Sequence, residues 1–215
     1  MKKEKKMRKK IIGFMVAGVL ILGLGFVSTP ASAELSLGLV GGYYSPNFGE
    51  INDDLDEVND FFGTDLELKA GMMYGLALGY DLPPHFGLRL EYNSFESKTS
   101  DTVLPGVDLD FELTVTPVIL SLLYGFSPFY VGAGVGSFST KLKWGYLFDS
   151  TALTMPDSDS PTGLVLLAGY GFGGEPIFLN LEARYVVGTK AKLEDAGTEV
   201  DLSGLQLSLL VGLKI

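Results

Sequence analysis

The chain has 215 residues, with 16 basic and 26 acidic side chains, one histidine and no cysteine. This composition excludes a disulfide framework, a thiolate metal site and a cluster of histidine ligands. The net charge of −10 argues against nucleic acid as a partner, because phosphate binding requires a basic surface.

The N-terminal residues have the pattern of a secretory signal peptide. Residues 2–10 are strongly basic, residues 11–27 form an apolar stretch, and Ala31-Ser32-Ala33 has the small residues of a cleavage site. The apolar stretch is shorter than the ~20 residues of a membrane-spanning helix, which disfavours an uncleaved anchor. We therefore expect residues 1–33 to be removed and residues 34–215 to form one domain. That domain has nine basic and 25 acidic residues, a net charge of −16.

The hydropathy of the remaining chain is high for an acidic protein. Mean hydropathy is +0.28 and 47% of the residues are hydrophobic, yet no apolar run of 18 residues follows the signal segment. A bilayer accepts only helices and closed barrels, because backbone polar groups must be paired within the protein. The composition therefore favours a β-barrel.

From residue 35 onward, large apolar residues alternate with glycine, small or polar residues, which is the period of a β-strand. Eight segments follow this pattern: 35–44, 72–81, 86–95, a segment ending near residue 124, 129–138, 163–172, 177–186 and 203–215. Pro117 cannot donate a ladder hydrogen bond, so it predicts a bulge in the fourth segment. The pattern predicts an all-β protein, an eight-stranded antiparallel transmembrane β-barrel.

The connections alternate between short and long, as in transmembrane barrels with periplasmic turns and outer loops. Short turns lie at 82–85, 125–128 and 173–176, and four long polar loops at about 45–70, 95–108, 139–161 and 188–201. Aromatic residues beside the short turns predict an inner girdle: Tyr80, Phe86, Tyr124, Phe126, Phe129, Tyr170 and Phe172. Tyr43, Tyr74, Tyr92 and Tyr185 predict the opposite girdle.

Charge placement indicates which strand face meets lipid. Of the 25 acidic residues, 20 lie in the long loops or at their margins, as do six of the nine basic residues. No charge lies on the large apolar face of a strand, where it would cost ~2–4 kcal/mol at the bilayer midplane. A soluble barrel of the lipocalin kind would have the opposite pattern, so the apolar face is predicted to face outward.

Five ionisable residues on the small, polar faces form a candidate lumen charge network: Arg89, Glu91, Glu182, Arg184 and Lys214. The third and seventh strands face each other in a ring of eight, so each arginine should meet a glutamate across the lumen. A salt-bridge plug is favoured, because eight strands leave room for little more than side chains. A proton or solute path is the alternative.

Residues 48–63 carry the one helical signal, a possible interaction helix in the first long loop. Ile51, Leu55, Val58 and Phe62 have the spacing of one helix face, and acidic residues occupy the rest. We expect a short helix on the barrel rim; a cap over the barrel mouth, a partner-binding helix and a weak cation site are the alternatives. The acidic run lacks the glycine of an EF-hand loop.

Two single residues have alternative interpretations. His85 lies in a short turn, on the wrong side for a lipid-modifying enzyme that acts at the outer leaflet. Trp144 in the third long loop is an adhesive tip or an interface anchor.

The segments GLRLEY (87–92), YVGAGVG (130–136) and LNLEARY (179–185) resemble the OmpA/OmpX/OmpW-like family of small outer-membrane barrels. The resemblance covers essentially the whole mature chain. It implies residence in the cell outer membrane, with outer-membrane lipid and the outer-membrane assembly machinery as partners. Such barrels usually end in an aromatic residue, whereas this chain ends in Ile215.

Three functions are compatible with these observations. The favoured one is a non-enzymatic monomeric barrel with a structural or surface-interaction role, binding an extracellular ligand through acidic loops. The alternatives are an OmpW-like conduit for small or hydrophobic solutes, and a lipid-modifying enzyme. The sequence predicts no catalytic, cofactor-binding or metal residues.

Overall fold

The computed structural model describes residues 34–82, 85–104, 107–148, 151–193 and 198–215, so the expected signal peptide lies outside the described residues. Within these described residues the chain forms ten strands and one helix. They are β1 (Glu34–Asn47), α2 (Gly49–Phe62), β2 (Gly71–Leu82), β3 (Phe86–Leu104), β4 (Val107–Phe126), β5 (Phe129–Phe148), β6 (Thr151–Asp159), β7 (Thr162–Gly173), β8 (Ile177–Val187), β9 (Lys190–Leu193) and β10 (Thr198–Lys214).

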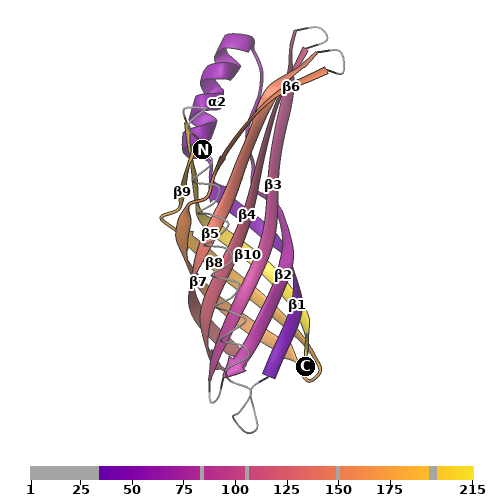
Figure 1. Ribbon diagram of the computed structural model, residues 1–215, viewed down its shortest axis with the longest axis vertical. Coiled ribbons are helices and arrows are strands. Elements are labelled where there is room, and N and C mark those ends of the chain that lie inside the picture. Colours follow the sequence, from indigo (N-terminus) through magenta and orange to yellow (C-terminus); the bar gives the residue numbers. More distant parts are fainter. Residues whose placement is uncertain (1–33, 83–84, 105–106, 149–150, 194–197) are drawn as a thin grey trace, which may run out of the picture. The chain divides into compact units, whose positions relative to one another are not determined.

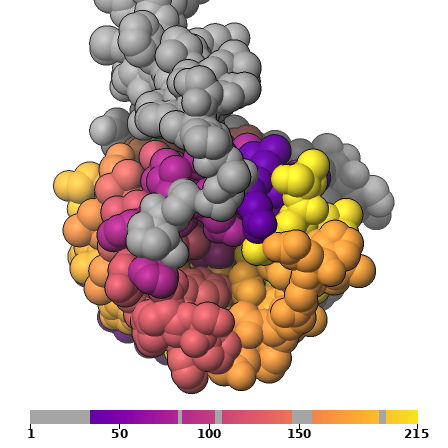
Figure 2. All heavy atoms as spheres, turned by 90° about the horizontal axis from the view of Figure 1, so that it is seen from below, coloured from indigo at the N-terminus to yellow at the C-terminus, as the bar shows by residue number. Residues whose placement is uncertain are grey.

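Eight of these strands close into a barrel (Figure 1). Neighbours pair in the order β1-β2-β3-β4-β5-β7-β8-β10, and β10 pairs back with β1. Leu39 of β1, for example, lies opposite Leu76 on one side and Val211 on the other. Figure 2 shows this closure, with the first strand (indigo) beside the last (yellow). The predicted eight-stranded antiparallel barrel is confirmed.

The two faces of the barrel wall differ as predicted. Large apolar side chains point outward and are exposed, while the intervening residues are buried: Leu39 is 65% exposed and its neighbour Val40 is 3% exposed. The same alternation places Leu76 outside and Ala77 inside on β2. A surface on which leucines are exposed in this regular pattern is the surface that a barrel presents to hydrocarbon.

Aromatic rings form a continuous row beside the short turns. Successive ring centroids are 4.5–6.5 Å apart along the series Phe86, Tyr124, Phe126, Phe129, Tyr170 and Phe172. These distances are those of edge-to-face and offset aromatic pairs. Six of the seven predicted aromatic residues therefore form one row of contacting rings beside the short turns, and Tyr80 is not part of that row.

Three of the four segments predicted as long loops contain strands, so those loop predictions were wrong. β3, β4 and β5 continue far beyond the barrel, and β6 pairs with β5 alone; we call these continuations, with α2 and β6, the extension. β9 pairs with the start of β10. These segments are polar in composition because one face of each meets water, while their period-two alternation persists.

The outer face of the extension carries a row of ion pairs across three strands. Lys98, Glu112 and Lys143 lie opposite one another in register on β3, β4 and β5. The carboxylate of Glu112 lies 3.5 Å from the Lys98 ammonium and 2.8 Å from the Lys143 ammonium. Opposite charges on neighbouring strands attract and so favour the pairing of β3, β4 and β5. In the sequence, the same charged residues made these segments look like polar loops.

Pro117 lies in β4 without a bulge, so that prediction was wrong. Tyr92 pairs with Val118 and Phe95 with Val115, so the register is the same on both sides of the proline. Pro117 itself lies opposite Phe138 of β5. The missing N–H removes a hydrogen bond without inserting an extra residue. Register shifts occur elsewhere, between Pro46 and Asn47 and between Thr102 and Leu104.

The predicted helix is confirmed as α2, which ends at Gly63 in the left-handed conformation (φ 72°). Ile51 and Leu55 are buried, and Val58 packs against the core. The fourth residue of the predicted face, Phe62, is 39% exposed, and its ring packs on Phe61 with centroids 4.8 Å apart. Phe62 is the last residue of the helix, and the residues of α2 that contact the core, Ile51, Leu55 and Val58, lie in earlier turns. No helix among the described residues is long and apolar enough to cross a membrane.

A hydrophobic core continues from the upper barrel into the extension. α2 contributes to it together with buried leucines of the strands and of the segment after the helix: Leu66, Leu68, Leu109, Leu113, Leu142, Leu193 and Leu202. Trp144 is half-buried against this core, which contradicts both predicted roles for it, an exposed tip and an interface anchor. Its position on the inner face of β5 follows from the unbroken alternation of that strand.

The segment after α2, residues 64–70, has side-chain hydrogen bonds on both sides in place of the backbone hydrogen bonds of a regular β-ladder. On one side the backbone N–H groups of alternate residues donate to side-chain oxygens of β3, in the pairs Asp65–Asp101, Glu67–Thr99 and Lys69–Ser97 (2.8–3.2 Å). On the other side the amides of Asn52 and Asn59 each exchange two hydrogen bonds with the backbone of Leu68 and Leu66 (2.8–3.1 Å). These contacts hold the helix against the edge of β3.

Candidate functional site: a charge cluster in the barrel lumen

Two strands on opposite sides of the barrel place four charged residues in the lumen. β3 and β8 are four positions apart in the ring of eight. Arg89 and Glu91 flank an outward leucine on β3, and Glu182 and Arg184 flank an outward alanine on β8, so all four side chains point inward. Their exposed fractions are 4%, 1%, 4% and 1% in that order.

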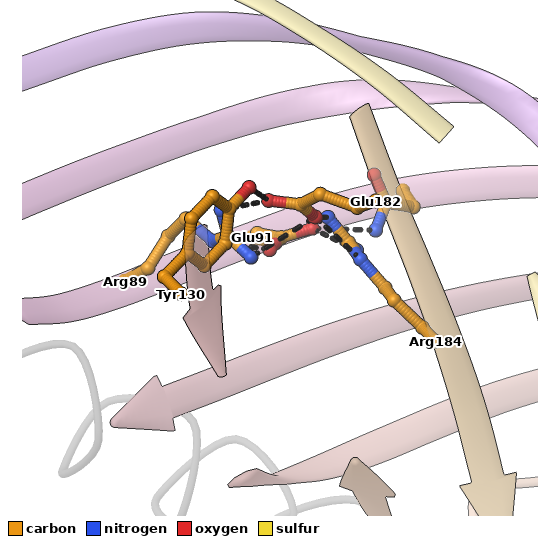
Figure 3. A network of polar contacts seen from close by, with 6 residues as sticks. Arg89, Glu91, Tyr130, Glu182 and Arg184 are labelled. Atoms are coloured by element: carbon orange, nitrogen blue, oxygen red, sulfur yellow. Dashed lines mark hydrogen bonds and ion pairs between the residues drawn. The ribbon is translucent and has the colours of Figure 1, made fainter. Parts of the chain in front are cut away.

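The four side chains pair across the lumen as the sequence predicted (Figure 3). Arg89 donates to both carboxylate oxygens of Glu182, one of the two through Nη2 at 3.1 Å. Arg184 donates through Nη1 to Glu91 Oε2. The planar fork of a guanidinium matches a carboxylate in this two-bond arrangement. Each arginine therefore meets the glutamate of the opposite strand.

Contacts along each strand close the four residues into a ring. Arg184 also donates to Glu182, through Nε at 2.8 Å and through Nη2. Arg89 Nε lies 2.7 Å from Glu91 Oε1 as an ion pair. Each carboxylate thus contacts both guanidinium groups, and the two positive and two negative charges cancel within the cluster.

Tyr130 is a fifth member that sequence reasoning missed. It lies on the inner face of β5, where its hydroxyl donates to Glu182 Oε1 and its ring centroid is 5.9 Å from Arg89 Cζ. Gly169 lies opposite it on β7, and a Cβ there would overlap the Tyr130 ring. The signal was present in the sequence, because Tyr130 is a large polar residue on an otherwise glycine-rich strand face.

Further polar residues lie at the level of the cluster. Asn93 donates to Glu91 Oε2 at 3.3 Å. Ser121, Gln206 and Ser208 are buried and lie opposite Arg89, Arg184 and Glu182 in the registers of the neighbouring strands. Buried apolar residues lie at the same level, with Ile119 opposite Glu91 and Leu167 opposite Arg184. The lumen around the cluster is therefore lined by both polar and apolar side chains.

Lys214 does not belong to the cluster, which corrects its predicted place in the network. Its ammonium lies 2.7 Å from Glu34 and 3.7 Å from Asp81, near the short-turn end of the barrel. Ser208 is the β10 neighbour of Glu182. Lys214 lies six residues farther along that strand, about 20 Å at the rise of a β-strand. Strand alternation correctly predicted that Lys214 lies on the polar, inward face of its strand. Its distance along the strand nevertheless keeps it away from Arg89 and Arg184.

The remaining candidates form no second site. The backbone carbonyl of His85 accepts a hydrogen bond from Gly125, and its ring lies 6.0 Å from that of Tyr124. These contacts hold the short turn against the next one. In the part of the chain that the structure describes, no three histidine, aspartate or glutamate side chains are grouped to hold a metal ion.

No protein-family model matches the chain, and no curated protein matches it in sequence. Solved structures are similar to it in fold. A major outer membrane protein of Thermus thermophilus is 16% identical over 86% of this chain and 100% of its own, with a TM-score of 0.52. OprG of Pseudomonas aeruginosa is 14% identical over 86% and 96%, with a TM-score of 0.48.

Ail, the attachment invasion locus protein of Yersinia pestis, in complex with the heparin analogue sucrose octasulfate, is 15% identical over 85% of this chain and 97% of its own, with a TM-score of 0.45. At these identities the likeness concerns the fold. The chain has the fold of small eight-stranded outer-membrane β-barrels, as its sequence predicted.

Proposed function

We propose that this chain is a non-enzymatic protein of the cell outer membrane, in which a sealed barrel carries a folded extracellular extension for surface interactions. The band of exposed leucines and the row of aromatic rings beside the short turns support a place in a bilayer. The signal-like N-terminal sequence supports export. In this orientation the short turns face the periplasm.

The observation that carries the proposal is the closed charge cluster in the lumen. Arg89, Glu91, Glu182 and Arg184 are buried, mutually paired and neutral as a group. An eight-stranded barrel has an interior that side chains fill, so this cluster spans the space through which a solute would pass. Its proposed role is to seal and stabilise the barrel.

The charge and the order of the extension support the proposed role in surface interactions. By sequence, the four segments at about 45–70, 95–108, 139–161 and 188–201, with their margins, hold 20 acidic and six basic residues, so the field around them is negative. They are ordered by their own hydrophobic core and by the side-chain contacts of residues 64–70. A rigid, acidic structure of this kind is suited to binding other molecules.

A conduit for small or hydrophobic solutes is the alternative, which the further polar residues in the lumen favour: Ser121, Gln206 and Ser208 lie beside the cluster on the neighbouring strands. Planar-bilayer recordings separate the two functions. The sealed barrel predicts little steady current through the wild-type protein. The double variant Arg89→Ala/Glu182→Ala, which removes one cross-lumen pair, should conduct measurably more.

The matched control is Lys214→Ala, which removes a charge from the polar strand face outside the cluster and should leave the current at the wild-type level. Large, stable wild-type currents would refute the seal and support the conduit. Mass spectrometry of outer-membrane lipids from cells with and without the protein tests the third function: an altered acyl pattern would indicate an enzyme.

A further inference from the structure

The outward face of β5 changes from apolar to polar where the barrel wall passes into the extension. β5 pairs with β7 up to Ser137 and with β6 beyond it. On the outward face, Val135 is 52% exposed, and every second residue after it is polar: Ser137, Ser139 and Lys141. The alternation of β5 is unbroken here, so these side chains continue the surface that meets lipid.

Hydroxyl side chains cover this boundary on four neighbouring strands. They lie beside one another in the strand registers and share the outward face: Thr114, Thr116, Ser137, Ser139, Ser158 and Thr162. We call these six residues the hydroxyl belt. All six are half-buried or exposed, and none of their hydroxyl groups makes a hydrogen bond within the part of the chain that the structure describes. Their donors and acceptors are therefore available to a molecule outside the protein.

Lys141 differs from the other basic residues that the structure describes. Residues 34–215 contain nine basic side chains, and eight of them form ion pairs: Lys69, Arg89, Lys98, Lys143, Arg184, Lys190, Lys192 and Lys214. Lys141 has no ion pair or hydrogen bond within the described residues, although acidic residues outnumber basic ones 25 to nine. Its neighbours on β4 and β6 are Thr114 and Ser158 of the hydroxyl belt.

The position of Lys141 places its ammonium near lipid headgroups. Tyr92, a tyrosine predicted to belong to the girdle opposite the short turns, lies in one cross-strand row with Val118 and Ser137. Lys141 is four residues beyond Ser137, about 13 Å along the strand, and strand tilt reduces this to a height of roughly 10 Å. The headgroup region extends about 5–7 Å beyond the hydrocarbon, and a lysine side chain can reach back toward it.

We propose that Lys141 and the hydroxyl belt bind the phosphate-bearing sugar headgroup of a glycolipid in the outer leaflet. The ammonium donates to a phosphate oxygen, and the belt exchanges hydrogen bonds with the sugar. The nearest carboxylate on β4, that of Glu112, is held by Lys143 at 2.8 Å and leaves Lys141 uncompensated. Continuity with the lipid-facing surface, which is independent of charge, indicates a membrane lipid as the occupant.

This proposal rests on the proposed function, because the extension must face the exterior of the outer membrane. It is tested with the mature chain folded in non-ionic detergent. The probe is an acylated, bis-phosphorylated glucosamine disaccharide, and native mass spectrometry gives the dissociation constant of the first bound lipid. The same lipid without phosphates should bind about 3- to 10-fold more weakly. The phosphorylated disaccharide without acyl chains should not compete at an equal concentration.

Three variants and one control locate the contact. Lys141→Gln should weaken binding about 3- to 10-fold, and Lys141→Arg should stay within about twofold of the wild type because it keeps the charge. Ser139→Ala/Ser158→Ala should weaken binding about 2- to 5-fold. The control Lys192→Gln removes the same charge from an exposed lysine whose ammonium lies 3.2 Å from Glu199, and it should change affinity less than about twofold.

Folding is checked by gel mobility and thermal stability, which Lys141→Gln should leave unchanged because Lys141 makes no polar contact within the described residues. Equal binding of the two lipids, equal effects of Lys141→Gln and Lys192→Gln, or full competition by the free sugar phosphate would overturn the proposal. A barrel that is sealed in bilayer recordings while Lys141→Gln binds like the wild type leaves the proposed function intact and refutes the headgroup site. Open currents with lipid binding that depends on Lys141 would support the headgroup site and refute the sealed barrel.

Discussion

Glu182→Ala should be among the most destabilising single changes in the barrel. Its carboxylate accepts from Arg89, Arg184 and Tyr130. The two arginines are 4% and 1% exposed, so water cannot replace the lost partner. Breaking a buried ion pair by removing one member costs about 3–5 kcal/mol, because the other charge stays buried and uncompensated. We expect that loss in the free energy of unfolding.

The double variant Arg89→Ala/Glu182→Ala distinguishes a paired cluster from four independent contributions. It leaves Arg184 bound to Glu91, a neutral pair, so its cost should be less than the sum of the two single costs by about 2–3 kcal/mol. The measurement is urea-induced unfolding in lipid, followed by the gel mobility of the folded barrel. Ser208→Ala is the control, because Ser208 is the buried neighbour of Glu182 on β10, and its cost should stay below about 1 kcal/mol. Additive costs, or a Glu182→Ala variant as stable as the control, would refute the account.

Three further predictions concern orientation, the lipid face and the extension. In intact cells an impermeant maleimide should label Glu67→Cys on the extension and fail to label Gly174→Cys in a short turn until the outer membrane is permeabilised; the reverse pattern would invert the topology. Leu90→Arg should lower the folded yield far more than Ser94→Arg, because the cost of an outward arginine falls from ~2–4 kcal/mol at the midplane to ~0–1 at the interface; equal yields would mean that Leu90 does not face lipid. The side chain of Asn59 binds the N–H of Leu66 at 2.8 Å and its C=O at 3.0 Å. Asn59→Ala should therefore speed hydrogen exchange of the Leu66 amide by an amount equivalent to about 1–3 kcal/mol. Unchanged exchange would show that these two hydrogen bonds do not hold the segment.

Much of the barrel could be predicted from the sequence because its wall is specified locally. A strand between lipid and a packed lumen must alternate, so the positions of Leu88, Leu90 and Tyr92 against Arg89 and Glu91 define both faces. The same alternation, with the order of short and long connections, placed β3 opposite β8 and therefore predicted the cross-lumen ion pairs. The helix face of Ile51 and Leu55 followed from spacing in the same way.

Other features depended on contacts between distant parts of the chain. Polar composition suggested loops at 95–108 and 139–161, but pairing between β3, β4 and β5 makes them strands. Their outer face is charged, and their inner face joins the hydrophobic core to which α2 also contributes. Trp144 becomes a core residue for this reason. The exclusion of Lys214 depends on strand register, and the inclusion of Tyr130 depends on the space that Gly169 leaves.

The sequence by itself thus determined which side of each strand meets lipid, because that choice depends on one residue and its immediate neighbours. The tertiary structure decided which inward residues share a level in the lumen, where the strands end, and which carboxylates of α2 find a partner. These depend on register and on packing between segments more than 100 residues apart, such as Glu50 with Lys190, and residue type alone does not specify them.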